Sequence, residues 1–170
     1  NLQTLTLNTD NLSSLDLTNN AQLKELTVSS TSISSLDLTN NAQLRELTIS
    51  DTNVSSLDLT KNTQLEELYC SSMNIETLDL TTNIKLKNVN TSECKKLKYI
   101  FVNSNYININ WTLSENTSIS IKDSTGLIQI NTDDNNKYFM KYLKEYHQVQ
   151  TFIRNGNVFV KKSQLDKIFD

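Results

Sequence analysis

The fold is decided by three nearly identical stretches that follow one another: LSSLDLTNNAQLKELTVSSTSI (residues 12–33), ISSLDLTNNAQLRELTISDTNV (33–54) and VSSLDLTKNTQLEELYCSSMNI (54–75). Their period is 21 residues, and each unit holds two L-x-x-L-x-L segments about ten residues apart, such as 23–28 and 33–38. The last two apolar residues of a segment alternate as in a short β-strand, while the first lies inward after a bend. No unit can bury these residues alone, so the units must stack around a continuous core.

Turns in this array must form without the usual turn residues. The chain of 170 residues has 36% hydrophobic residues, which is enough for a core, but it has no Pro, and its two Gly are Gly126 and Gly156. Asn is abundant instead, with 23 residues. Asn and Thr side chains can hydrogen-bond nearby backbone groups and imitate a turn. We therefore predict that the coil is turned by two columns at the 21-residue period: Asn20, Asn41, Asn62 and Asn83, and Thr18, Thr39, Thr60 and Thr81.

Charge and composition exclude several classes of function. A formal net charge of -3 and a pI near 5.2 give no basic field for nucleic acid or anionic lipid. No apolar run approaches the ~20 residues of a membrane span. The single histidine, His147, has no nucleophile motif near it, and the two cysteines form no C-x-x-C pair. We therefore expect a non-enzymatic protein with no catalytic residue, metal or cofactor.

The repeats resemble those of bacterial leucine-rich-repeat surface proteins with 21-residue units, the internalin J-like and Bacteroidetes family. The motif L-x-x-L-x-L/V/I/C-x-x-N/T-x-L/I/V is found in LQTLTLNTDNL (2–12), LKELTVSSTSI (23–33), LRELTISDTNV (44–54) and LEELYCSSMNI (65–75). In that family Cys often fills the last apolar place of the strand, where this chain has Cys70. The resemblance implies a right-handed leucine-rich-repeat solenoid, mainly β, whose convex side is irregular or built of 3-10 turns and short strands.

The period also suggests the domain organisation. Residues 1–105 hold about five leucine-rich units, although the register changes after Leu86, where a looser L-x-x-I-x-V segment follows at 97–102. Alternation at 107–113 and 119–121 predicts capping strands within 106–125. Residues 126–170 should form a small α+β extension, with a strand at 127–130, a helix over 138–146 and a hairpin around Asn155-Gly156.

Candidate binding residues face outward between the inward Leu positions. By the resemblance they lie on the concave sheet, the face that such proteins commonly use for partners. The face is polar with one aromatic, which suits a protein or a glycan but also describes a plain solvated sheet. The candidates are Glu25, Thr27, Glu46, Thr48, Glu67, Tyr69, Asn88 and Asn90.

Two further sets of residues have mainly structural explanations. Asp16, Asp37, Asp58 and Asp79 form an outward column that could attract a hard cation such as calcium, but a solvated face explains it as well. Cys70 replaces an aliphatic residue and should be buried, and Cys94 is offset from it by one unit plus three residues, which disfavours a disulfide.

Two functions remain open from the sequence. The first is a monomeric interaction module, secreted or on the cell surface, that binds a protein or glycan in adhesion or host interaction. The chain starts within its pattern at Asn1-Leu2, so we expect an upstream signal peptide to have been removed. The alternative is a structural spacer or display stalk in which the C-terminal extension carries any binding.

Overall fold

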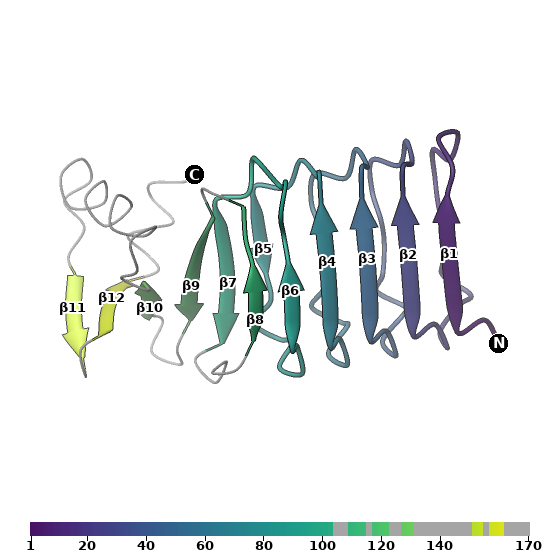
Figure 1. Cartoon of the computed structure of the whole chain (residues 1–170). Coiled ribbons are helices and arrows are strands. Elements are labelled where there is room, and N and C mark those ends of the chain that lie inside the picture. Colours follow the sequence, from purple (N-terminus) through teal and green to yellow (C-terminus); the bar gives the residue numbers. More distant parts are fainter. Residues whose placement is uncertain (104–108, 115–116, 123–126, 131–150, 155–156, 162–170) are drawn as a thin grey trace.

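The 21-residue units wind into a solenoid, one coil per unit (Figure 1). The computed structural model describes residues 1–103, 109–114, 117–122, 127–130, 151–154 and 157–161. Each coil contributes one strand to a six-stranded parallel sheet, which we call the first sheet. The predicted leucine-rich-repeat solenoid is thereby confirmed. The strands of the first sheet, in spatial order, are β1 (Thr4–Asn8), β2 (Glu25–Ser29), β3 (Glu46–Ser50), β4 (Glu67–Ser71), β6 (Asn88–Asn90) and β8 (Asn110–Thr112).

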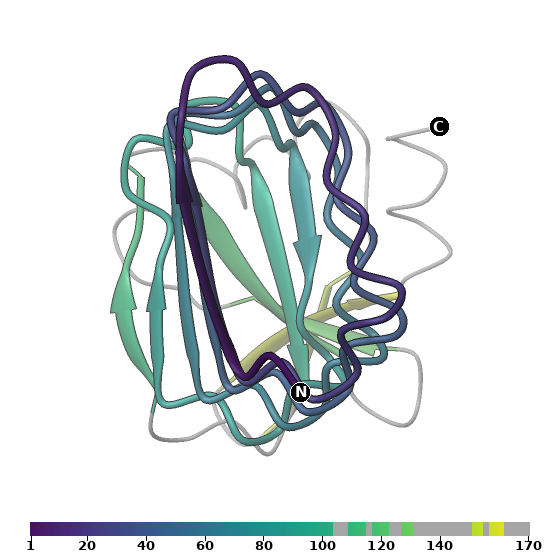
Figure 2. The same ribbon diagram turned by 90° about the vertical axis from the view of Figure 1, so that its right-hand side faces the viewer.

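The core is a stack of equivalent apolar side chains from successive coils. Leu26 pairs in register with Leu47, and Leu47 with Leu68, and all three are at most 1% exposed. Figure 2, which looks along the solenoid from its N-terminal end, shows the first coils lying over one another. Burying one such side chain contributes about 1.5–3 kcal/mol, so the columns together stabilise a fold that no single coil could hold.

The turns that follow β2, β3, β4 and β6 use a left-handed backbone conformation without glycine. Ser30, Asp51, Ser72 and Glu93 have φ angles of 49°, 50°, 52° and 61°. This conformation costs roughly 1–2 kcal/mol for a residue with a Cβ. Part of this cost is offset by pairing, because the N–H of Ser30 donates to the carbonyl of Ser50 at 3.2 Å, and Asp51 repeats the bond one coil later. Sequence reasoning did not find this turn.

The predicted Asn column turns and ties the coils on the other side of the strands. Asn41, Asn62 and Asn83 are 0% exposed. The Nδ2 group of Asn41 donates to the carbonyls of Leu17 at 3.2 Å and Asn20 at 3.0 Å, both in the previous coil. Asn62 and Asn83 make the equivalent bonds. Each amide therefore joins two coils, and the structural role expected for this column is confirmed.

A second sheet forms at the C-terminal end of the solenoid, across the core from the first. Strands β5, β7 and β9 pair in parallel, and β10, β12 and β11 continue the sheet in antiparallel pairs. In Figure 1 this sheet lies at the end opposite the N-terminus. Its strands, in spatial order, are β11 (Thr151–Arg154), β12 (Asn157–Lys161), β10 (Leu127–Ile130), β9 (Ser118–Lys122), β7 (Tyr99–Asn103) and β5 (Thr77–Asp79).

The register change after Leu86 has a simple explanation in this sheet. The 97–102 segment is the second half of the fifth coil, because Ile100 pairs with Leu78, 22 residues earlier. In the first sheet β8 pairs with β6 at the same offset, Asn88 with Asn110. The fifth coil is therefore one residue longer than its predecessors.

Several expectations for the C-terminal region can be checked. β8 lies within the alternating segment 107–113, β9 contains the segment 119–121, and β10 coincides with the strand expected at 127–130. β11 and β12 pair antiparallel with Arg154 opposite Asn157, as the hairpin prediction requires. The helix expected over 138–146 and His147 lie outside the described residues. Within the part of the chain that the structure describes, no helix is long and apolar enough to cross a membrane.

Candidate interaction surface

The outward face of the first sheet brings all eight candidate residues together. Alternation places Leu and Val side chains in the core, so the residues between them point outward. In-register pairing then stacks equivalent residues in two columns. One column is Glu25, Glu46, Glu67 and Asn88, and the other is Thr27, Thr48, Tyr69 and Asn90.

Tyr69 is the large side chain of this face. It is 39% exposed, and its hydroxyl donates to Oε2 of Glu67 at 2.6 Å. This hydrogen bond to a carboxylate, with a smaller effect of burial, raises the pKa of Tyr69 above its ordinary value. The bond also holds the ring toward the start of β4, so an aromatic surface with a defined orientation faces solvent.

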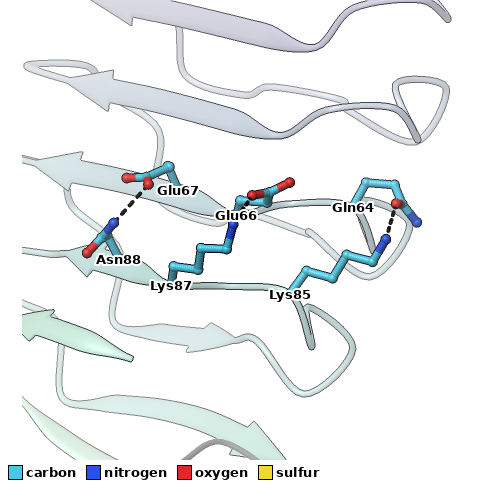
Figure 3. Close-up of polar contacts among 6 residues, drawn as sticks. All are labelled: Gln64, Glu66, Glu67, Lys85, Lys87 and Asn88. Atoms are coloured by element: carbon cyan, nitrogen blue, oxygen red, sulfur yellow. Dashed lines mark hydrogen bonds and ion pairs between the residues drawn. The ribbon is translucent and has the colours of Figure 1, made fainter. Parts of the chain in front are cut away.

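Hydrogen bonds between coils order most of the Glu column. Thr4 donates to Glu25 at 3.1 Å, and Nδ2 of Asn88 donates to Oε1 of Glu67 at 2.8 Å (Figure 3). Asn110 in turn donates to Oδ1 of Asn88 at 2.9 Å. Glu46, in the middle of the column, makes no side-chain hydrogen bond with any residue that the structure describes. Its carboxylate is open to an external donor.

A hollow of about 250 Å³ lies where β2, β3 and β4 begin. Three of its residues were not singled out from the sequence, although they recur at the 21-residue period directly before the Glu column: Lys24, Arg45 and Glu66. The complete lining is Lys24, Glu25, Arg45, Glu46, Glu66 and Glu67.

The charges around the hollow are unevenly paired. The Lys24 ammonium donates to Oε1 of Gln3 at 3.1 Å, and Lys87 forms an ion pair with Glu66 (Figure 3). The hydrogen bond from Lys87 lowers the pKa of Glu66 and raises that of Lys87. The Arg45 side chain is exposed and has no hydrogen bond or ion pair among the described residues. Arg45 and Glu46 are thus the two adjacent groups of the hollow with unused hydrogen-bonding capacity.

The Asp column has a structural role in the turns. Oδ1 of Asp37 accepts from the N–H of Thr39 at 2.9 Å and from its hydroxyl at 2.7 Å. Asp58 makes the same bonds to Thr60. These bonds, the backbone bond first, lower the pKa of both carboxyls. Among the described residues no group of three acidic, His or Cys side chains could hold a metal ion.

Both cysteines are free and buried, Cys70 as predicted. The Cys94 thiol donates to the carbonyl of Cys70 at 3.4 Å. Burial raises the pKa of both thiols. A thiol that stays protonated is a poor nucleophile and a poor metal ligand, so these residues act as small apolar side chains.

One solved structure relates the fold to a known protein. The chain is similar to the functional domain of InlJ from Listeria monocytogenes, which includes a cysteine ladder, with a TM-score of 0.58 and 24% sequence identity. The similarity covers 69% of this chain but only 31% of the InlJ chain. No protein-family model and no curated protein matches the chain. The chain therefore shares the leucine-rich-repeat solenoid fold of the InlJ domain.

Proposed function

We propose that the chain is a non-enzymatic interaction module that binds a protein or glycan partner on the outward face of the first sheet. The observation that carries this proposal is the in-register array of eight candidate residues, in which Tyr69 is exposed and Glu46 is unpaired. An array whose backbone is held in register by the sheet needs little reordering of the main chain when a partner binds, which favours affinity.

The Glu column supports a binding role because its carboxylates repel one another in the unbound chain. Glu25, Glu46 and Glu67 lie directly opposite one another on neighbouring strands. Like charges in this arrangement destabilise a sheet. A partner that donates hydrogen bonds to the column would relieve that repulsion, whereas a purely structural face gains nothing from it.

The proposal extends to the setting in which the module works. We place it outside the cell, secreted or on the surface, as a monomer acting in adhesion or host interaction. The support is the fold shared with the functional domain of InlJ from Listeria monocytogenes. A structural spacer is the competing function.

An array of host proteins and glycans, probed with the intact chain, tests the proposal. The double variant Tyr69→Ala/Glu46→Lys changes the outward face, and Lys61→Glu is the matched control because Lys61 is exposed on a turn away from it. Binding that is lost in the double variant and kept in the control supports the proposal. Binding that survives the double variant contradicts the choice of face, and a chain that binds nothing is a spacer. Hydrolysis of any substrate would contradict the non-enzymatic role.

A further inference from the structure

The hollow at the start of β2, β3 and β4 interleaves hydrogen-bond donors with acceptors. Lys24 and Arg45 supply the donors, and four carboxylates supply the acceptors. A small anion entering the hollow would meet the four carboxylates, and a small cation would meet the ammonium and guanidinium groups. The four carboxylates outnumber the two cationic groups, so the lining disfavours a compact anion, and Lys24 and Arg45 offset part of its attraction for a cation.

A neutral ligand with several hydroxyl groups fits this lining. A hydroxyl donates one hydrogen bond and accepts two, so it can be satisfied by a carboxylate and a guanidinium at once. Arg45 and Glu46 are adjacent in the chain and make no side-chain hydrogen bond among the described residues. Both groups present two parallel polar atoms, which can bind two neighbouring hydroxyls of one ring.

Tyr69 adds an apolar surface beside the hollow. Its hydroxyl is bonded to Glu67, which lines the hollow, and its ring remains 39% exposed. An aromatic ring that is polar at one end and apolar on its face can cover the C–H side of a sugar while the polar groups bind its hydroxyls. The volume of about 250 Å³ suits one sugar residue more than a folded protein surface.

We infer that this hollow is a binding site for a neutral sugar residue of a glycan, with Arg45 and Glu46 binding its hydroxyls and Tyr69 covering one face. The inference rests on the proposed function and names the class of partner. Because the sugar carries no charge, its binding should depend little on ionic strength, unlike the binding of a basic protein to the Glu column.

The test uses the intact chain and two probes. An array of neutral oligosaccharides identifies the terminal sugar, and saturation-transfer NMR with methyl glycosides of glucose, galactose, mannose, fucose and N-acetylglucosamine measures binding directly. The variants are Arg45→Gln, Glu46→Gln and Tyr69→Ala. The controls are Lys61→Gln and Glu76→Gln, at exposed positions outside the hollow. Circular dichroism and thermal unfolding verify that each variant is folded.

We expect at least about tenfold weaker sugar binding, or about 1.4 kcal/mol, in each folded variant of the hollow, because Arg45→Gln and Glu46→Gln each remove a charged hydrogen-bonding group and Tyr69→Ala removes the ring that covers the sugar. The controls should bind as the unchanged chain does, at low and high salt. Equal weakening in the controls, or no effect in the three variants, overturns the inference.

Failure of the inference is distinguishable from failure of the proposed function. A protein partner that requires Glu46 and Tyr69, with no neutral sugar bound, overturns the sugar site and leaves the interaction module standing. Binding that weakens steeply as the salt concentration rises would likewise overturn the sugar site and leave the interaction module standing. If no protein and no glycan binds, both are wrong.

Discussion

The Nδ2 group of Asn62 donates to the main-chain carbonyl of Asn41, 21 residues earlier, at 3.0 Å. The same group also donates to the carbonyl of Leu38 at 3.1 Å, so one buried amide links two points of the previous coil. Asn41 and Asn83 make the equivalent bonds, so a column of buried side-chain amides links each coil to the one before it.

Substitution of Asn62 by Ala should therefore destabilise the chain strongly. It removes the side-chain donor shared by two carbonyls, which keep only their main-chain donors, and it opens a small cavity, so we expect the free energy of unfolding to fall by about 2–4 kcal/mol. Urea unfolding followed by circular dichroism measures the loss. Lys61→Ala, at the exposed neighbouring position, is the control and should change stability by less than about 0.5 kcal/mol. Similar losses in both variants would show that the buried amide bonds are not the cause.

The left-handed turn after β4 predicts a stabilising substitution. Ser72 is exposed and has a φ of 52°, which glycine adopts without steric cost. Ser72→Gly should raise the free energy of unfolding by about 0.5–1 kcal/mol, after allowing for the greater freedom of glycine in the unfolded chain. Ser56→Gly, at an exposed position without a positive φ, should lower it by a similar amount. The difference between the two variants in urea unfolding is the decisive measurement.

The Asp turns predict a loss of stability in acid. Hydrogen bonds from Thr39 and Thr60 lower the pKa of Asp37 and Asp58 below the ordinary value of 3.8. The folded state therefore binds fewer protons than the unfolded state, so the stabilisation is complete above 3.8 and is lost as the pH falls through the lower, folded pKa values.

Urea unfolding between about pH 5 and pH 2 measures this effect as the slope of stability against pH. The double variant Asp37→Asn/Asp58→Asn removes both titrating groups and keeps an acceptor oxygen at each turn. It should lose less stability than the unchanged chain over this interval. Equal slopes would contradict the role of the two carboxylates.

The buried Cys70 predicts both chemical inertness and a preference among substitutions. Burial raises the pKa of its thiol, so Ellman's reagent should label Cys70 in urea but not in the folded chain. Cys70→Val should be tolerated, because Val28 and Ile49 fill the same column. Cys70→Ser buries a hydroxyl in that column and should cost about 1–3 kcal/mol. Rapid labelling of Cys70 in the folded chain would contradict its burial.

Tyr69 gives a direct measure of the site geometry. The hydrogen bond to Glu67 raises the pKa of Tyr69 above 10.0, so Glu67→Gln should lower that pKa toward the ordinary value. Carbon NMR of the ring Cζ atom follows the titration of this residue among the six tyrosines. Glu76→Gln, outside the first sheet, should leave it unchanged. A Tyr69 titration that ignores Glu67 would show that the two side chains do not meet.

Much of this architecture follows from the period of the sequence, because a fixed repeat places equivalent residues in register. The period brought Glu46 and Thr48 to the same outward face, and it identified Asn62 as a turn residue. The hollow was missed because Arg45 lies at a bend, where alternation no longer tells which way a side chain points. The left-handed turn at Ser72 was missed because serine is a common residue in many conformations.

The formation of β5 depends on tertiary contacts and does not follow from the local sequence. The tripeptide Leu-Asp-Leu occurs at 15–17, 36–38, 57–59 and 78–80, but only at the last place do its first two residues lie in a strand, β5. The difference is the partner, because β7 lies beside β5 and pairs with Leu78 and Asp79. Strand formation on this side of the core therefore depends on the next coil rather than on the tripeptide itself.

Because equivalent residues of successive coils pair in register, distance along the solenoid is counted in whole coils. Each unit advances the first sheet by one strand spacing, about 4.8 Å, without changing the surface that it offers to its neighbours. Removing residues 34–54 would join coils whose contact faces are the same, and would bring Tyr69 one spacing nearer to Glu25. The distance between the aromatic ring and any group on an earlier coil is thus set by counting units, which lets the footprint of a partner be matched by duplication or loss of whole repeats.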